Sequence, residues 1–206
     1  MQLNEKFGRL ADHATLERAA VALEKNGIAA VIVEDGEAAK KKVREIIPEG
    51  AEVMTMSSMT LEAIGLVQEL NESGRYQSAK AKLMTMDPKT QGLEMRRLGA
   101  APEWAVGSVH AVTEEGTLLV ASNTGSQLPA YAYAAGHVIW VVGAQKVVKD
   151  TEEGLRRIDE YSFPLEDERA QKAYGVHSFV SKILILNREI AKRRATVIFV
   201  KEKLGF

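Results

Sequence analysis

The sequence contains no cysteine, which excludes disulfides, a cysteine nucleophile and cysteine-ligated iron–sulfur or zinc sites within these 206 residues. No covalent haem-attachment motif or dinucleotide fingerprint is present either. The histidines show no metal-ligand spacing, so we expect no dedicated metal site and no cofactor held covalently or by cysteine.

Other features are also absent. No apolar run is long enough to span a bilayer, and residues 1–10 are polar rather than signal-like. The formal net charge is only −1, which argues against a broad electrostatic surface for nucleic acid. With no visible linker or repeat, we expect a cytoplasmic protein that binds neither membrane nor nucleic acid.

Apolar runs alternate with helix-like segments along the N-terminal half. Ile28 to Val33 and Glu52 to Met56 are strand-like, Glu37 to Ile47 is helix-like, and a further helix is expected from Thr60 to about Leu70. This alternation predicts an α/β fold with a parallel sheet covered by helices. We expect a single α/β domain over residues 23–206, with residues 1–22 as an N-terminal helical appendage.

The segment from Gly107 to Lys146 is the most informative part of the chain. A hairpin is expected between Ala105 to Thr113 and Thr117 to Ala121, across an acidic turn. The apolar run Val138 to Val142 is typical of a central strand. We expect the strands ending at Ala121 and Val142 to deliver polar groups to the same edge of one sheet, where open α/β proteins bind ligands.

Two polar loops join a strand to a helix. In the first, Ser57 to Thr60, helix dipole and free N–H groups favour an anion, although capping by Ser58 or Thr60 explains the same residues. The second, Ser122 to Gln127, could cradle a phosphate, a carboxylate or a pantetheine-like chain. It is neither a Walker A loop nor G-x-G-x-x-G, and a tight turn that needs glycine is the alternative.

Four further side chains carry potential chemistry. Glu114, in the hairpin turn, is a candidate nucleophile or base if the turn aims it into a cleft, and is otherwise a solvated carboxylate. His110 is a candidate ligand or a packed histidine, while Gln145 and Lys146 follow a strand, where the lysine could neutralise an acid or face solvent. The candidate ligand-binding set is Ser57, Ser58, Thr60, His110, Ser122, Asn123, Thr124, Gly125, Ser126, Gln127, Gln145 and Lys146.

The chain resembles the LUD (lactate-utilisation domain) family of LutC/YkgG type over roughly residues 23–200. The family's Glu-Thr-Gly-Thr hairpin is matched by Glu114-Glu115-Gly116-Thr117, and its Leu-Pro by Leu128-Pro129. The residues from Ser57 to Gly65 resemble its Ser/Thr-rich loop and helix. The chain departs from the pattern over Gly175 to Ile183, where the family's proline and acidic residue are absent.

The resemblance implies a three-layer α/β/α sandwich with a mostly parallel sheet, like that of CoA transferases, ribose-5-phosphate isomerase and glucosamine-6-phosphate deaminase. It also implies a link to bacterial L-lactate oxidation alongside iron–sulfur partner subunits. Glu114 matches the position of the nucleophilic glutamate of CoA transferases, but a shared fold does not transfer a reaction.

These observations support one leading hypothesis and two alternatives. The leading hypothesis is a non-redox component of lactate or organic-acid utilisation that binds a small anionic metabolite or a CoA-like ligand. The alternatives are a freestanding enzyme of the CoA-transferase/sugar-phosphate-isomerase superfold and a ligand-sensing or interaction module. Catalysis, and assembly as a homo-oligomer, are left open by the sequence.

Overall fold

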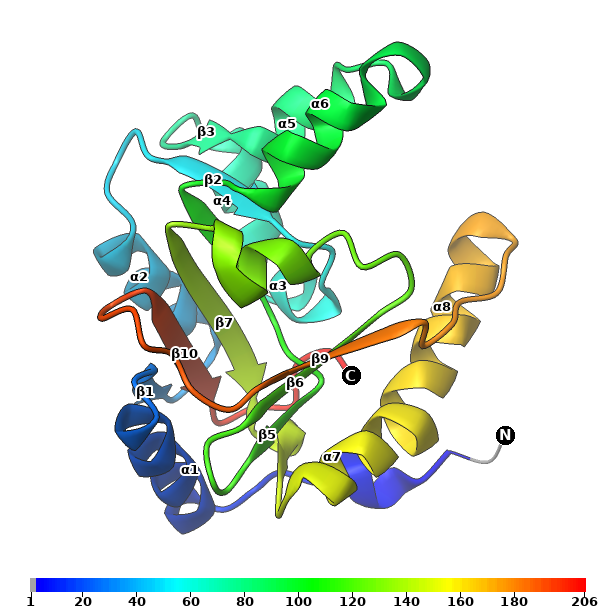
Figure 1. The fold of residues 1–206 in the computed structure, drawn as a ribbon. Coiled ribbons are helices and arrows are strands. Elements are labelled where there is room, and N and C mark those ends of the chain that lie inside the picture. Colours follow the sequence, from blue (N-terminus) through cyan, green and yellow to red (C-terminus); the bar gives the residue numbers. More distant parts are fainter. Residues whose placement is uncertain (1–2) are drawn as a thin grey trace.

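A six-stranded sheet that is parallel throughout forms the centre of the molecule (Figure 1). The computed structural model describes residues 3–206. The strand order is β1-β10-β7-β4-β2-β3. The strands are β1 (Ala29–Val33), β2 (Glu52–Thr55), β3 (Gln77–Ser78), β4 (Trp104–Gly107), β7 (His137–Gly143) and β10 (Ala195–Val200).

A second, four-stranded sheet of order β8-β5-β6-β9 lies beside the first. Its strands are β5 (Ala111–Thr113), β6 (Leu118–Ser122), β8 (Val147–Val148) and β9 (Lys182–Leu186). The hairpin of β5 and β6 is antiparallel, β6 and β9 are antiparallel, and β5 and β8 are parallel. The expectation of one sheet was therefore wrong. The expected strand from residue 105 to 113 is divided, with β4 in the large sheet and β5 in the small one.

Helices cover the sheets and connect their strands. The α-helices are α1 (His13–Lys25), α2 (Gly36–Ile46), α3 (Met59–Ala63), α4 (Leu66–Glu72), α5 (Ala79–Met84), α6 (Pro88–Ala100), α7 (Thr151–Arg157) and α8 (Phe163–Tyr174). Two short 3-10 helices are η1 (Glu5–Gly8) and η3 (Ala144–Lys146), and two short π-helices are η2 (Ala130–Ala134) and η4 (Ile158–Ser162). No helix among residues 3–206 combines the length and apolarity needed to cross a bilayer.

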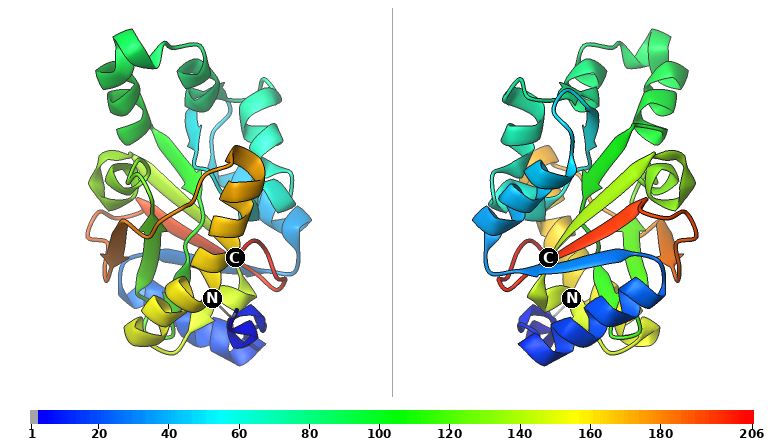
Figure 2. Two further views of the ribbon diagram at one scale, coloured as in Figure 1. Left: turned by 90° about the vertical axis from the view of Figure 1, so that its right-hand side faces the viewer. Right: turned by 90° about the vertical axis from the view of Figure 1, so that its left-hand side faces the viewer.

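The central strands are buried on both faces, which explains their almost continuous apolar sequences. In β7, Ile139 and Val141 pack into the cluster that holds Val43 of α2 and Leu61 of α3. The alternate residues of β7, beginning with Val138, pack on the other face among residues of α1 and the second sheet. The layers are thus α2–α4, the large sheet, and then α1 with the small sheet, as the side views of Figure 2 show. The expected three-layer α/β/α arrangement is confirmed.

The outer face of the small sheet is covered by the continuous segment α7–η4–α8. Leu119 and Ile158 belong to the cluster between them. Pro164 near the start of α8 has no N–H, so the carbonyl of Glu160, four residues earlier, needs another donor. The backbone N–H of Asn4 fills that role at 3.0 Å. The N-terminal turn η1 therefore fixes the bend at which α8 leaves the body of the molecule (Figure 1).

Several local expectations differ from the structure. Helix α1 is integral to the core rather than an appendage, because Leu16 and Leu23 are buried against the large sheet, and a boundary at residue 22 would cut through it. The helix expected from residue 60 to 70 is broken into α3 and α4 by Gly65, whose φ is +70°. Leu83 and Met84 lie at the end of the short helix α5, which Ser78 caps.

Candidate functional site

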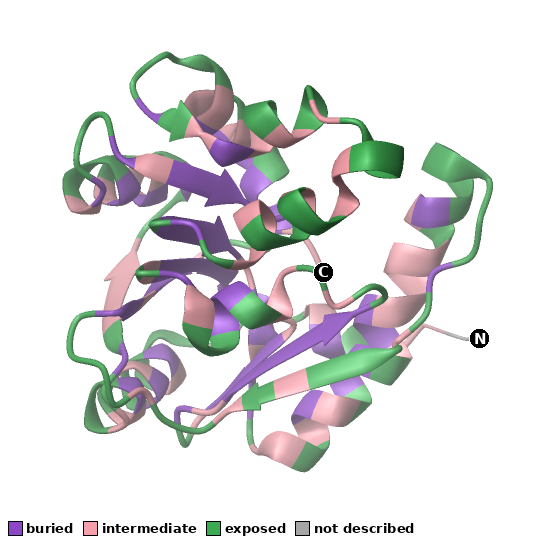
Figure 3. Cartoon of the chain, turned by 45° about the horizontal axis from the view of Figure 1, so that its top comes forward, coloured by how far each residue is buried: buried purple, intermediate pink, exposed green. Residues whose placement is uncertain are grey.

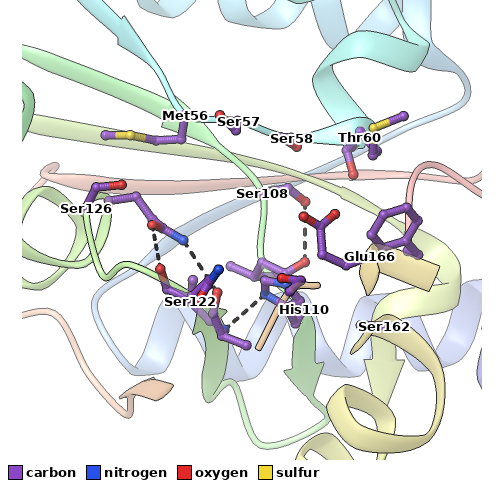
Figure 4. A pocket seen from close by; sticks show the side chains of 18 of the residues that line it. Met56, Ser57, Ser58, Thr60, Ser108, His110, Ser122, Ser126, Ser162 and Glu166 are labelled. Atoms are coloured by element: carbon purple, nitrogen blue, oxygen red, sulfur yellow. Dashed lines mark hydrogen bonds between the residues drawn. The ribbon is translucent and has the colours of Figure 1, made fainter. Parts of the chain in front are cut away.

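A cavity of about 390 Å³ lies where the loops after β2, β4 and β6 meet α8 and the segment that follows it (Figure 4). In the burial view of Figure 3, α8 stands apart from these loops, and the residues at its C-terminal end are exposed. Because the cavity is built from both sheets, the loops after β2 and β6 converge although their strands do not share a sheet edge.

The loop after β2 is held in place at both ends. The backbone N–H of Met56 donates to the carbonyl of Val106 at 2.9 Å. Ser58 caps α3, its Oγ accepting the N–H of Leu61 at 3.4 Å. Thr60 is 1% exposed and donates its hydroxyl to the carbonyl of Leu204 at 3.1 Å. The capping alternative is therefore observed for Ser58, while Ser57, Ser58 and Thr60 all border the cavity (Figure 4).

The loop after β6 closes on itself through its own polar groups. Ser122 Oγ accepts the N–H of Gly125 at 2.8 Å and donates to Gln127 Oε1 at 2.9 Å. Gln127 Nε2 returns to the carbonyl of Ala121 at 3.4 Å. Gly125 has a φ of +85°, so the turn needs a glycine there. The polar side chains are thus pre-organised beside the cavity rather than free to rearrange.

Lys146 is a buried lysine in the lining of the cavity, where it is 2% exposed. Its Nζ donates to Thr60 Oγ1 at 2.9 Å, to Ser108 Oγ at 3.1 Å and to the carbonyl of Val109 at 3.1 Å. Ser108 donates its own proton to the carbonyl of Val141 at 2.7 Å. Thr60 likewise donates its proton to the carbonyl of Leu204, so the hydroxyl oxygens of Thr60 and Ser108 are both free to accept from Lys146. Three acceptors match the three N–H bonds of an ammonium group.

Arg157 is a second buried cation, fully enclosed behind the cavity wall. It donates to the carbonyls of His110 and Gln145 and to Ser162 Oγ, while its Nη2 has no partner. Burial lowers the pKa of Arg157 to about 10, so it remains protonated at neutral pH. Among residues 3–206, no carboxylate forms an ion pair with either buried cation.

His110 is a fixed hydrogen-bonding group rather than a base. Its Nδ1 accepts the backbone N–H of Ala121 at 3.1 Å, which leaves the proton of the neutral ring on Nε2. Burial, together with the charges of Lys146 and Arg157, lowers the pKa of His110 to about 3. The ring is therefore neutral at physiological pH and can offer only its Nε2 N–H to a ligand in the cavity it lines.

The lowered pKa of Lys146 predicts that binding of an anion takes up protons. Burial and, secondarily, the charge of Arg157 lower the pKa of Lys146 well below its ordinary value. A bound anion favours the ammonium form and raises that pKa again, so affinity should fall as pH rises through the interval between the two values. Calorimetric titration in two buffers of different ionisation enthalpy measures the uptake; proton release, or an affinity that rises with pH, would contradict it.

A known family and a solved structure are similar to this chain. The family model described as LUD domain matches residues 16–200. This chain belongs to the LUD domain family. A crystal structure of a DUF162 family protein from Deinococcus radiodurans is similar in fold, with a TM-score of 0.56 over 93% of this chain and 99% of that one, at 13% identity. No curated protein matches the chain.

The LUD domain brings most of the sequence-predicted residues to one place. The members of the predicted set that line the cavity are Ser57, Ser58, Thr60, His110, Ser122, Asn123, Thr124, Ser126, Gln127 and Lys146. Gly125 is not on the lining and serves the turn. Gln145 is 1% exposed and faces away, its Nε2 donating to the carbonyls of Leu204 at 2.9 Å and Gly205 at 3.2 Å. We therefore assign Gln145 to holding residues 204–205 rather than to a ligand.

Glu114 does not line the cavity, and of the two alternatives for this residue the structure shows the carboxylate on the surface. Its carboxylate pairs with Arg18 Nε of α1 at 2.8 Å on the protein surface. The turn is directed there by Asn26, whose Nδ2 donates to the carbonyls of Glu115 at 2.9 Å and Gly116 at 3.2 Å. The geometry therefore gives the proposed nucleophile no access to a ligand in the cavity.

We expect Glu114→Gln to leave ligand affinity within about twofold of the unmodified LUD domain, because the residue lies outside the cavity. The ion pair with Arg18 is solvent-exposed, so its loss should change the free energy of unfolding by less than about 1 kcal/mol. Isothermal titration and urea unfolding of the variant measure both quantities. A large loss of affinity would return Glu114 to the site.

Sequence patterns did not predict the part of the cavity that α8 and the segment after it form. Ser108, Ser162, Glu166 and Arg169 also line the cavity, as does the segment 178–180, which lies where the chain departs from the family's pattern. Period-two and helical patterns could place Ser108 at a strand end, but not the distant α8 beside it. No three His, Asp or Glu side chains gather into a potential metal site in the part of the chain that the structure describes.

Proposed function

We propose that this LUD-domain protein binds a small organic acid in the cavity and takes part in lactate or organic-acid utilisation as a non-redox component. One observation carries the proposal: two buried basic side chains, Lys146 in the lining of the cavity and Arg157 behind its wall, have no carboxylate partner among residues 3–206. A buried charge is costly unless it is paired. A bound carboxylate would supply the missing negative charge.

The inner end of the cavity can hold such a group in two complementary ways. Lys146 already uses its three N–H bonds within the protein, so it acts on a ligand chiefly as a fixed positive charge. His110 supplies a hydrogen-bond donor, because the Ala121 N–H keeps its proton on Nε2. Burial of these groups lowers the effective dielectric constant around them and so strengthens both interactions. The combination favours a carboxylate over a neutral polar group.

The organic-acid assignment is supported by the family, whose name refers to lactate utilisation, and by the composition. Oxidation of lactate needs an electron acceptor, which side chains of this kind do not supply. These residues contain no cysteine with which to ligate an iron–sulfur cluster. In that setting the protein would hand over, retain or sense the acid, and a redox partner subunit would carry the electrons.

A freestanding acyl- or CoA-transferring enzyme is less well supported by the cavity. Such an enzyme would use a carboxylate nucleophile. Glu114 lies elsewhere, and of the two carboxylates in the lining, Glu166 has both oxygens bound to Arg169 at 2.8 Å, while Glu62 is an exposed residue of α3. Turnover of a CoA ester by the isolated chain would nevertheless show that the protein is such an enzyme.

Calorimetry and thermal unfolding with L-lactate, pyruvate and neutral lactamide test the proposal. Lactamide matches lactate in size but lacks its charge. We expect the acids to bind and to raise the melting temperature with concentration, by about 2.7 kcal/mol of stability at a hundred times Kd. Lactamide should bind at least tenfold more weakly, a difference of about 1.4 kcal/mol. Absence of binding by any organic acid tested, in the presence of a folded protein, would refute the proposal.

A further inference from the structure

The cavity is larger than a three-carbon acid requires. Lactate has six non-hydrogen atoms, and even at the roughly 30 Å³ that a water molecule occupies in the liquid it would fill less than about 180 Å³. The cavity measures about 390 Å³. A volume in this range is typical of sites for larger metabolites, from about 300 Å³ upward. Roughly half of the space would remain after an acid of that size had bound at Lys146.

The α8 side of the cavity carries apolar and aromatic side chains beside Ser162 and the Glu166–Arg169 pair. Phe163 at the start of α8, together with Phe179 and Val180 from the following segment, lines this side. Phe179 is 62% exposed, although its neighbour Ser178 is 7% exposed. The backbone is anchored, because the N–H of Ser178 donates to Asp167 Oδ1 at 2.7 Å. The Phe179 ring therefore lines the cavity while most of its surface stays exposed.

This wall offers no free cation for a second acidic group. Arg169 lines it, but its Nε and Nη2 are both bound to the carboxylate of Glu166 at 2.8 Å. The remaining lysine of the lining, Lys80, comes from α5, which packs against β2 on the Ser57 side. The lysines of the lining thus lie away from α8, and the cation of the α8 side, Arg169, is already paired with Glu166. The α8 side therefore favours an uncharged part of a ligand.

We propose that the ligand is a monocarboxylic acid that carries an aromatic or bulky apolar substituent. Its carboxylate lies at the Lys146 and His110 end, and its substituent packs against Phe163 and Phe179. This inference rests on the proposed function, because it takes the carboxylate site as given, and it extends that function by naming the class of acid. Burial of the substituent and of the exposed Phe179 ring supplies the additional affinity.

Three related compounds test the inference by isothermal titration with the full chain. L-Lactate carries the carboxylate alone, 3-phenyllactate adds a phenyl ring, and 3-phenylpropane-1,2-diol keeps the ring but lacks the carboxylate. We expect 3-phenyllactate to bind at least tenfold tighter than lactate, since a largely buried ring contributes about 1.5–3 kcal/mol. The neutral diol should bind at least tenfold more weakly than 3-phenyllactate, because the cost of burying Lys146 is then not offset.

A variant locates the added affinity. Phe179→Ala should reduce the affinity ratio of 3-phenyllactate to lactate by at least about threefold, and because the ring is exposed the change should leave the fold intact. Ile190→Ala is the matched control, since Ile190 is 90% exposed and does not line the cavity, and it should leave the ratio unchanged.

The outcomes separate this inference from the proposed function. Equal binding of lactate and 3-phenyllactate, or an unchanged ratio in Phe179→Ala, would overturn the inference and leave the carboxylate site standing. Binding of the diol as tight as that of 3-phenyllactate would overturn the anchoring of the acid at Lys146. Failure of both acids to bind would overturn the proposed function, and the inference with it.

Discussion

Lys146→Met should weaken the binding of an organic acid by about a hundredfold or more. Methionine keeps most of the length and volume of the side chain but removes its charge. At an effective dielectric constant of about 20, two unit charges about 5 Å apart interact by roughly 3 kcal/mol, which corresponds to about two decades in Kd. The variant should also abolish the proton uptake that accompanies binding. Isothermal titration measures both effects on one sample.

The control for this variant is Lys149→Met, three residues further along the chain. The Lys149 side chain is 81% exposed and its contact with Asp150 is long, at 3.8 Å, so the same loss of charge should change the affinity by less than about twofold. Melting curves of both variants establish that they fold. Unchanged affinity in a folded Lys146→Met variant would remove the buried lysine from the binding site.

Gly116→Ala should destabilise the fold by about 3 kcal/mol. The φ of Gly116 is +80°, a conformation that costs other residues about 1–2 kcal/mol. A Cβ atom there would also lie 2.7 Å from the carbonyl carbon of Ala22 and 2.7 Å from the N of Leu23. These are backbone atoms of α1, so relief requires the hairpin to move off the helix, and overpacking of this kind adds about 1–3 kcal/mol. Urea unfolding measures the total.

Gly50→Ala separates the two contributions. Gly50 has almost the same φ, +81°, but no heavy atom lies within 4 Å of the position of its missing Cβ. This variant should lose only the conformational part, about 1 kcal/mol. Similar losses in the two variants would show that contact between the hairpin and α1 contributes little to stability, and that the glycine of the acidic turn is needed for its φ alone.

Some features of this protein follow from the sequence alone because they depend on local pattern. The run Val138 to Val142 is a central strand, since only a strand buried on both faces is apolar at every position. The alternation of strands and helices determined the parallel sheet and the layers. The polar residues directly after β2 and β6 predicted two loops, and both loops border the cavity. The prediction was possible because polar side chains become tolerated where a strand ends and the chain emerges from the core.

Other features were decided by tertiary structure, because they depend on which segments meet. The apolar pattern of Leu118–Ser122 would suit a strand in either sheet. Only its pairing with Lys182–Leu186 and Ala111–Thr113 places it in the smaller sheet. Glu114 could point inward or outward from its turn until the contact with Arg18 fixed its direction. Such contacts join residues far apart in the chain, and no periodicity within a segment records them.

The residues of the candidate site also divide into features that the local sequence predicted and features that only the tertiary structure decided. The sequence identified Lys146 as a cation at the end of a strand, but its burial and its lack of an ion-pair partner come from Thr60 and Ser108 on two other loops. Arg157 lies on a helix whose sequence resembles an ordinary solvated surface, and its position behind the cavity follows from the packing of α7 against the small sheet. The local pattern thus determined which groups stand at strand ends. Long-range packing determined which charges are buried together, because desolvation depends on the surroundings in space and not on neighbours in sequence.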